Sequence, residues 1–369
     1  MIATTKPPAA SIVFPVLAIV FVFLAPLIGF DAGGQSPSFL SLILSGAMII
    51  IMLGAVFAAV HHADVIAHRI GEPFGTLVLT LAVTIIEVAL IESIVLTPGS
   101  SPALARDTVF AVIMIVCNGL VGVCILWGGL RHHEQEFQTS GASVYLSVLA
   151  ALSVLTLVLP NYTVTAIGPY FSNQQLIFVS IITIILYVAF LFIQTSRHTD
   201  YFRADVDAGQ HGDHEYPSSR LVGISVAMLL LALCGVILTA KKFAVILELG
   251  LSRIGAPPAV SGIIIAMVVL APESITAVQA AWRNELQKSI NLALGSSLAT
   301  IGLTIPAVAI TNVFIGKPIE IGLSSRDTLL LLLTLYLSLL TFGSGRTNIL
   351  AGIVHLVVFA TFLFLVFIP

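Results

Sequence analysis

Two glutamates, Glu87 and Glu273, stand inside the apolar runs GTLVLTLAVTIIEVA (75–89) and VVLAPESITA (268–277). A charged carboxylate at the centre of a membrane costs at least about 2.5–3.5 kcal/mol on insertion scales. Carboxylate oxygens bind hard cations such as Ca²⁺, Mg²⁺ and Na⁺, and a carboxylate in an apolar setting also binds protons. We therefore predict a site at which a metal cation and protons compete for these two side chains. The alternative is a pair of buried glutamates that are hydrogen-bonded only for packing.

Pro272 directly precedes Glu273. Proline has no backbone N–H, and its ring displaces the carbonyl four residues earlier, here that of Val268. Freed backbone groups at membrane depth are tolerated where they line a cavity or are satisfied locally. We therefore expect a kink at Pro272, with backbone oxygen, including that of Ala271, available beside the carboxylate.

Threonines precede the first glutamate at helical spacing. Thr76, Thr80, Thr84 and Glu87 are separated by four, four and three residues, so they form one polar stripe on a helix. Such hydroxyls often only bond back to their own helix, an interpretation that suits Thr76 and Thr80. Thr84, one turn from the carboxylate, is the predicted ligand.

Two later apolar runs contain polar patches that would supply neutral oxygens to a cation. Asn118 lies in one run, and Ser296 and Ser297 lie in the other. Asn291 and Thr300 are secondary candidates along the same pathway. Any one of these hydroxyls is also compatible with a simple helix–helix hydrogen bond.

Three further titratable residues lie within or beside apolar runs. Glu92 is a candidate for an outer half-channel or for an edge position without chemistry. Glu72 either caps a helix, where it complements the helix dipole, or guards an inner entrance. His355 is either a hydrogen-bonded core histidine or a proton relay.

The remaining histidines and the cysteines point to no resident metal. The pairs His61–His62 and His132–His133, with His68, flank the ends of apolar runs at spacings that are not diagnostic of a metal site. The three cysteines lie in apolar runs and form no CxxC, which argues against a disulfide framework and against zinc. We expect no cofactor.

Composition identifies the environment of all these residues. The 369 residues are 58% hydrophobic and 9% charged, with a mean hydropathy of +1.10, whereas soluble domains are about 25% charged. The chain is therefore predicted to be an integral membrane protein. Its net charge of −3 argues against a nucleic-acid partner. The first apolar run is too long for a signal peptide, and many others follow it.

A membrane-crossing helix needs about 20 apolar residues. On this basis the fold is an all-α polytopic membrane protein of about eleven transmembrane helices. The expected spans are 12–30, 38–60, 74–97, 107–129, 143–160, 173–194, 220–240, 259–281, 287–312, 327–341 and 347–368.

The chain contains an internal repeat. An ungapped alignment of 75–89 with 261–275 superposes Glu87 on Glu273, and CNG at 117–119 then corresponds to GSS at 295–297. The glutamate helices are the third and eighth spans, so they cross the membrane in opposite directions. One helix followed by two inverted five-helix repeats is an arrangement of secondary transporters, which bind their substrate near the midplane.

Basic residues set the expected orientation. With the N-terminus in the cytoplasm, nine Lys and Arg residues fall on the inner side and six on the outer. The polar segment between the halves is then cytoplasmic, as a solvated connector or as a cation or pH sensor. The predicted organisation is an N-terminal helix and loop, a first repeat, an acidic, His-bearing loop and a second repeat, at 1–37, 38–196, 197–219 and 220–369.

Three segments, 71–93, 105–122 and 270–306, resemble the Ca²⁺/cation antiporter superfamily, and within it the bacterial ChaA-type antiporters of the CAX group. The resemblance implies that the family's paired glutamates match Glu87 and Glu273. It also implies that the polar residues of the following helices match Asn118 and Ser296–Ser297. Many members carry Gly-Asn before the glutamate motif, whereas this chain has TIIE and APES, which brings monovalent cations into consideration.

The resulting hypothesis is a secondary antiporter that exchanges cytoplasmic cation, with Ca²⁺ preferred and Na⁺ or K⁺ as candidates, for external protons by alternating access. A monovalent-selective Na⁺(K⁺)/H⁺ antiporter, a cation channel and an intramembrane enzyme are the alternatives. An enzyme would need a nucleophile–base pair or HExxH-type ligands, and the sequence contains neither. The expected partners are cations, protons and the lipid bilayer, with a bacterial inner membrane as the location.

Overall fold

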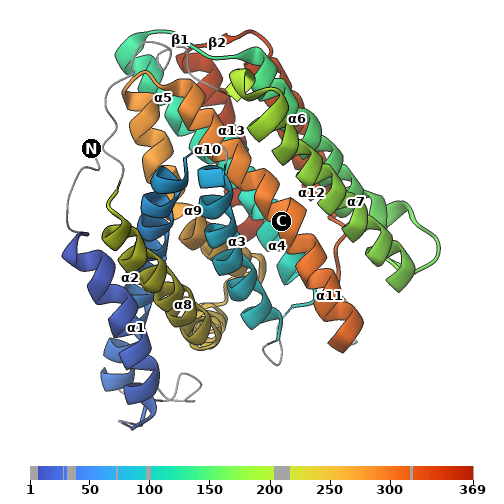
Figure 1. Cartoon of the computed structure of the whole chain (residues 1–369). Coiled ribbons are helices and arrows are strands. Elements are labelled where there is room, and N and C mark those ends of the chain that lie inside the picture. Colours follow the sequence, from blue (N-terminus) through green and yellow to red (C-terminus); the bar gives the residue numbers. More distant parts are fainter. Residues whose placement is uncertain are drawn as a thin grey trace. The chain divides into compact units, whose positions relative to one another are not determined.

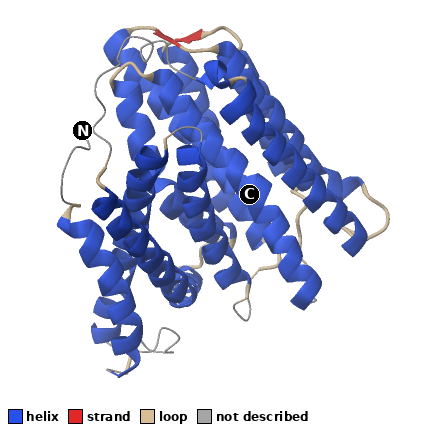
Figure 2. Ribbon diagram, in the orientation of Figure 1, coloured by secondary structure: helices blue, strands red, loops and turns tan. Residues whose placement is uncertain are grey.

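The computed structural model describes residues 7–27, 29–30, 39–71, 74–96, 101–202, 217–315 and 319–368. Helices dominate this part of the chain (Figure 2). Ten of its helical segments are long and apolar enough to cross a membrane. The glutamate-bearing third span forms α3 (Phe74–Val95). The predicted all-α polytopic membrane protein is thus confirmed.

The chain forms two compact units. One comprises Met1–Ser100 and His211–Ala256, and the other comprises Ser101–Gln210 and Pro257–Pro369. This division follows packing rather than chain order, so each unit draws helices from both halves of the sequence.

The first unit consists of α1 (Ala9–Leu27), α2 (Phe39–Ile70), α3 and α8 (Ser219–Arg253). α2 packs against each of the other three (Figure 1). α2 has 32 residues and α8 has 35, about 48 and 52 Å at 1.5 Å per residue, whereas the hydrocarbon core is about 30 Å thick. These helices therefore extend beyond the predicted spans 38–60 and 220–240, because hydropathy marks the membrane-embedded part and not the full helix.

A buried histidine joins three helices of this unit. His62 of α2 is fully buried. Its Nε2 donates to the backbone carbonyl of Ser11 in α1 at 3.0 Å, and its Nδ1 lies 3.2 Å from the hydroxyl of Ser225 in α8. Because the carbonyl only accepts, the neutral ring carries its proton on Nε2 and accepts from Ser225 at Nδ1.

The second unit contains the remaining elements. They are α4 (Leu104–Met114), η1 (Ile115–Leu120), α5 (Val121–His132), β1 (Gln135–Glu136), α6 (Thr139–Ser153), η2 (Val154–Val158), η3 (Leu159–Tyr162), α7 (Asn173–Phe192), η4 (Ile193–Arg197), η5 (Thr199–Phe202), α9 (Ala259–Trp282), α10 (Leu286–Ala299), η7 (Thr300–Thr304), α11 (Ile305–Ile315), α12 (Ser325–Phe342), β2 (Arg346–Thr347) and α13 (Ile349–Phe367).

The core of this unit is the helix formed by α4, η1 and α5. In an apolar stretch of 18 residues within this helix 89% of residues are buried, whereas 28% are buried in the corresponding stretch of α13. η1 and η7 are π-helical turns inside longer helices. Such turns are rare and occur frequently at functional sites. η1 contains Asn118, and η7 begins at Thr300.

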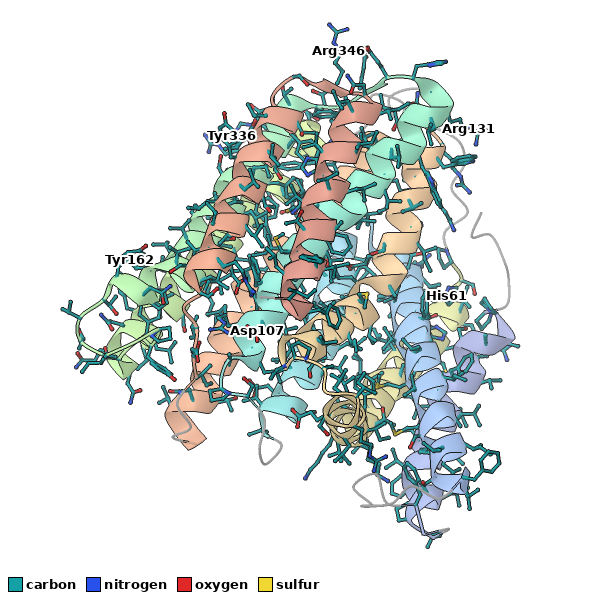
Figure 3. The ribbon with its side chains drawn as sticks, turned by 180° about the vertical axis from the view of Figure 1, so that it is seen from behind. His61, Asp107, Arg131, Tyr162, Tyr336 and Arg346 are labelled. Carbon is teal, nitrogen blue, oxygen red and sulfur yellow. The ribbon has the colours of Figure 1, made fainter. Side chains whose placement is uncertain are left out.

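Loop contacts tie the helix ends of this unit together. At one end β1 pairs antiparallel with β2, with Gln135 opposite Thr347, and the Gln135 amide donates to the Ala281 carbonyl of α9 at 2.9 Å. Arg131 lies over the Trp282 ring, 4.7 Å from its centroid, at this end (Figure 3).

The opposite helix ends are joined by polar contacts. Arg106, at the start of α4, pairs with Asp107 at 2.8 Å and with Glu320, and it donates to the Gly322 carbonyl at 3.0 Å. The Asn161 amide donates to the Leu323 carbonyl at 2.6 Å.

Candidate functional site

Glu273 faces Ser296 within the second unit. The Ser296 hydroxyl of α10 donates to Oε2 of Glu273 in α9, with an O···O distance of 2.5 Å. Both residues are partly exposed although each lies in a membrane-length helix. A carboxylate with a hydroxyl beside it offers the oxygen ligands that a hard cation prefers. The structure thus joins two residues that were each predicted as cation ligands, although their contact was not predicted.

Glu273 sits in an unbroken helix. α9 continues from Ala259 to Trp282 with Pro272 inside it. The proline, at which we expected a kink, therefore does not interrupt the helix. Thr276 Oγ1 donates to the Pro272 carbonyl at 3.1 Å. Ala271, whose backbone we considered a ligand, is partly exposed within the same helix.

Close packing at a glycine fixes the position of α9. A Cβ on Gly262 would lie 2.8 Å from the backbone nitrogen of Thr108 in α4. Only a residue without a side chain permits this approach. Gly262 is the repeat counterpart of Thr76, so the two halves carry different residues at this position of the sequence.

Other neutral oxygens of the predicted set lie further along α10 and η7. Ser297 is fully buried, and its hydroxyl has no hydrogen-bond partner within the described part of the chain. Thr300 is 1% exposed and begins η7. Buried hydroxyls are normally satisfied, so the Ser297 oxygen is available as a ligand.

Tyr187 was missed by the sequence analysis. This residue of α7 is 4% exposed, and its phenol lies within electrostatic reach of the Glu273 carboxylate. A Cβ on Gly302 of η7 would lie 2.9 Å from Cβ and Cγ of Tyr187. The missing side chain at Gly302 therefore lets the phenol pack against the π-helical turn. A tyrosine among apolar residues in the sixth span was the available signal.

Glu87 belongs to the first unit. It is 2% exposed in α3, and Thr84 is 4% exposed. The Thr84 hydroxyl donates to the Thr80 carbonyl at 2.9 Å. That bond uses the hydroxyl proton but leaves lone pairs on Oγ1, so Thr84 still offers an oxygen beside Glu87.

Asn118 faces α12 and α13, and no hydrogen bond joins its side chain to Ser296 or Ser297 among those the structure records. Its amide nitrogen donates to Thr334 Oγ1 at 2.8 Å, and its oxygen lies 3.1 Å from Nδ1 of His355. Nε2 of His355 lies 3.0 Å from Thr341 Oγ1. His355 is thus a hydrogen-bonded core histidine. Thr334 and Thr341 were not singled out from the sequence, although their spacing of seven puts them on one helix face.

Three secondary candidates have other surroundings or lie outside the described residues. Asn291 donates to the Phe202 carbonyl at 2.6 Å and accepts from Gln287 at 2.9 Å, so it holds η5 against α10. Glu92 is partly exposed near the end of α3. Glu72 lies outside the described residues.

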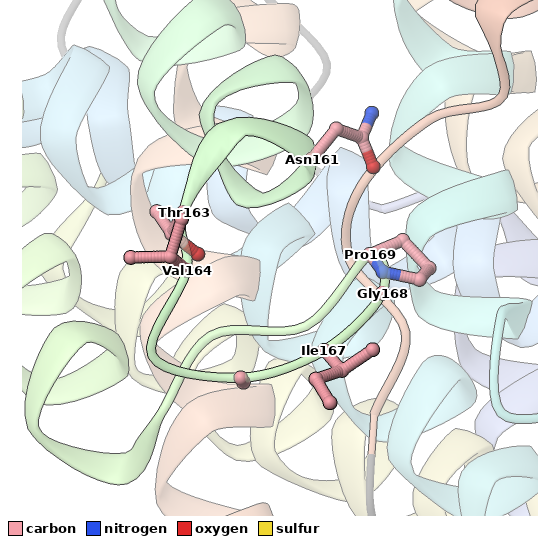
Figure 4. A pocket seen from close by; sticks show the side chains of 7 residues that line it. Asn161, Thr163, Val164, Ile167, Gly168 and Pro169 are labelled. Carbon is pink, nitrogen blue, oxygen red and sulfur yellow. The ribbon is translucent and has the colours of Figure 1, made fainter.

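Other parts of the chain show little sign of cation chemistry. Within the described ranges, no group of three or more His, Cys, Asp or Glu side chains is arranged to hold a metal. A surface pocket in the loop between α6 and α7 has no acidic side chain in its lining (Figure 4). It is lined by Asn161, Thr163, Val164, Ala166, Ile167, Gly168 and Pro169.

Comparison with known proteins places the chain in a family. The sequence profile of the sodium/calcium exchanger protein family matches residues 39–196 and 224–368. The chain is 47% identical over 321 residues to the y4hA protein of Sinorhizobium fredii, covering 86% of this chain and 87% of that one. It is 36% identical over 367 residues to the sodium-potassium/proton antiporter ChaA of Escherichia coli, covering 98% and 97%.

Solved structures share the fold. Native YfkE superposes with a TM-score of 0.70 at 18% identity, covering 97% of this chain and all of that one. The H⁺/Ca²⁺ exchanger CAX superposes with a TM-score of 0.66 at 13% identity, covering 95% and 87%. The profile match and the identity to near full-length relatives show that this chain belongs to the sodium/calcium exchanger family of membrane transporters.

Proposed function

We propose that the chain is a cation/proton antiporter of the bacterial inner membrane that moves cytoplasmic cation outward against inward-moving protons. Support comes from the hydrogen bond between Ser296 and Glu273 inside membrane helices and from relatives named as sodium-potassium/proton and Ca²⁺/H⁺ antiporters. Glu87 and Glu273 are the groups that exchange protons for cation.

The chemistry follows from competition for the same oxygens. A carboxylate in an apolar environment is costly as a bare charge, so it is neutralised either by a proton or by a cation. Thr84, Ser296 and Ser297 add neutral oxygens that favour the metal-bound state. Alternating access by two inverted repeats then exposes the loaded groups to one side at a time.

Ca²⁺ is the preferred cargo because several relatives are named Ca²⁺/H⁺ antiporters and because carboxylate and hydroxyl oxygens are the ligands that Ca²⁺ prefers. A monovalent-selective Na⁺(K⁺)/H⁺ antiporter is the second candidate. It is favoured by the name of the E. coli relative, which covers nearly the whole chain, and by the hydroxyl-rich surroundings of Glu273.

The test uses purified protein in proteoliposomes with an imposed pH gradient and measures Ca²⁺, Na⁺ and K⁺ flux. Glu87→Gln and Glu273→Gln are expected to abolish pH-driven exchange, because glutamine cannot carry the proton. Glu134→Gln is the matched control, since the Glu134 side chain is 61% exposed beyond α5. Undiminished exchange in both site variants would refute the proposal, and flux without proton counter-movement would identify a channel.

A further inference from the structure

His355 and Asn118 are linked by a chain of hydrogen bonds that crosses three helices. The Thr334 hydroxyl donates to the Leu330 carbonyl at 2.8 Å. Its oxygen is therefore free to accept from the Asn118 amide nitrogen, at 2.8 Å. This contact fixes which end of the amide faces α12 and turns the Asn118 oxygen toward α13.

The amide orientation in turn fixes the tautomer of His355. The Asn118 oxygen only accepts, so Nδ1 of His355 carries the proton and donates at 3.1 Å. Nε2 then accepts from the Thr341 hydroxyl at 3.0 Å. His355, Asn118 and Thr334 are each fully buried, so these bonds take place away from solvent.

Close helix packing brings the imidazole within reach of Asn118. A Cβ on Gly352 of α13 would lie 2.9 Å from the Gly122 carbonyl of α5. A Cβ on Gly119 would lie 3.3 Å from the Phe359 ring. Glycines on both sides of this crossing remove the side chains that would hold the helices apart.

Asn118, the hydrogen-bond partner of His355, lies in the π-helical turn η1. The imidazole also interacts with the backbone of Cys117 in the same turn. η1 packs on its other sides against α9 and α10, which carry Glu273 and Ser296. A histidine that holds both a side chain and the backbone of η1 therefore fixes one wall beside these two residues.

We infer that His355 is a positioning residue for cation selection: it locks the Asn118 amide and the turn η1 in one orientation. The inference rests on the proposed antiport function. If His355 has a purely structural role, replacing it changes folding stability alone. If it has a positioning role, replacing it also changes the preference among cations.

Two substitutions separate these roles. In His355→Asn the amide nitrogen takes the place of Nδ1 and keeps the donor to Asn118. In His355→Gln the amide takes the place of Nε2 and keeps only the contact with Thr341. Both variants are reconstituted, and the half-saturating concentrations of Ca²⁺, Na⁺ and K⁺ are measured together with thermal stability in detergent.

His355→Asn is expected to stay within about twofold of the unmodified protein, and His355→Gln is expected to change the ratio of Ca²⁺ to Na⁺ half-saturation by about fivefold or more, as for the loss of one buried hydrogen bond. Identical cation preference in the two variants would overturn the inference. If His355→Gln does not fold, Thr334→Val and Thr334→Ser test the hydrogen bond between Asn118 and Thr334 instead. The cation preference is expected to change only in Thr334→Val, because serine keeps the hydroxyl.

A further variant separates failure of this inference from failure of the proposed function. Glu273→Gln in the same assay must abolish proton-coupled exchange if the antiport proposal holds. Exchange that survives this change refutes the proposed function. Loss of exchange in Glu273→Gln, combined with unaltered selectivity in His355→Gln and Thr334→Val, refutes only the role of His355.

Discussion

The Ser296 hydroxyl donates a hydrogen bond of 2.5 Å to the Glu273 carboxylate, joining α10 to α9. Hydrogen bonds to an ionised acceptor are stronger than neutral ones, and this one stabilises the charged form of Glu273 against the protonated form. The charged form is the one that binds a cation. Ser296 thus influences the balance between proton and metal from outside the carboxylate itself.

Replacing Ser296 by alanine tests that influence. Without the donor, Glu273 retains its proton more readily, so the pH profile of exchange is expected to move to higher pH and the half-saturating cation concentration to rise at least about threefold. Ser147→Ala is the control, because the exposed Ser147 hydroxyl donates to the Ser143 carbonyl of its own helix. A profile that matches the unmodified protein would contradict the role assigned to Ser296.

Tyr187→Phe removes the phenol hydroxyl near Glu273 and keeps the ring that packs on Gly302. Losing a polar neighbour makes the charged carboxylate harder to maintain, so we again expect the pH profile to move to higher pH, with little change in thermal stability. Tyr336→Phe is the matched control, since Tyr336 is 60% exposed on α12. Equal profiles for the two variants would rule out a part for Tyr187.

His62→Leu is expected to destabilise the protein by about 2 kcal/mol or more, because the buried Ser11 carbonyl and Ser225 hydroxyl each lose a partner. The measurement is thermal unfolding in detergent. His68→Ala removes a histidine whose side chain is 54% exposed on the same helix, and its effect should stay within about 0.5 kcal/mol. Similar losses in both variants would show that the bonds of His62 contribute little.

Gly352→Ala would place a Cβ 2.8 Å from the Leu126 backbone nitrogen. The resulting overpacking should cost about 1–3 kcal/mol and separate α13 from α5. Gly223→Ala in α8 is the control, because nothing lies within 4 Å of its added Cβ, and a helical alanine there should stabilise by about 0.8–1 kcal/mol. A neutral Gly352→Ala would mean that the two helices adjust to the extra methyl group.

The helical architecture was readable from the sequence because apolar runs of about 20 residues have few alternatives. The helix lengths were not readable. α8 continues past Lys241 and Lys242 to Arg253, although these lysines look like the end of a span. Hydropathy reports where lipid begins and ends, whereas a helix continues as long as its residues favour it and neighbours pack against it.

Glu273 and Ser296 could each be singled out because each is a polar exception in an apolar run, but the sequence did not show that they touch. The partners of Asn118 were not expected. A π-helical turn changes the direction of side chains relative to the regular period of 3.6 residues, so periodicity could not show that Asn118 points toward Thr334 and His355. Tyr187 packs on Gly302 through tertiary contacts, which leave no periodic signal in the sequence.

The pairing of Gln135 with Thr347 has a mechanical consequence. It couples the α5–α6 connection to the α12–α13 connection, and the Gln135 amide adds the end of α9. The ends of the helices joined by these contacts, α5, α6, α9, α12 and α13, are therefore expected to rotate together. A disulfide engineered between positions 136 and 346, the other pair of these two strands, keeps the Gln135 amide and is expected to leave turnover unaffected, because the two strands should move together.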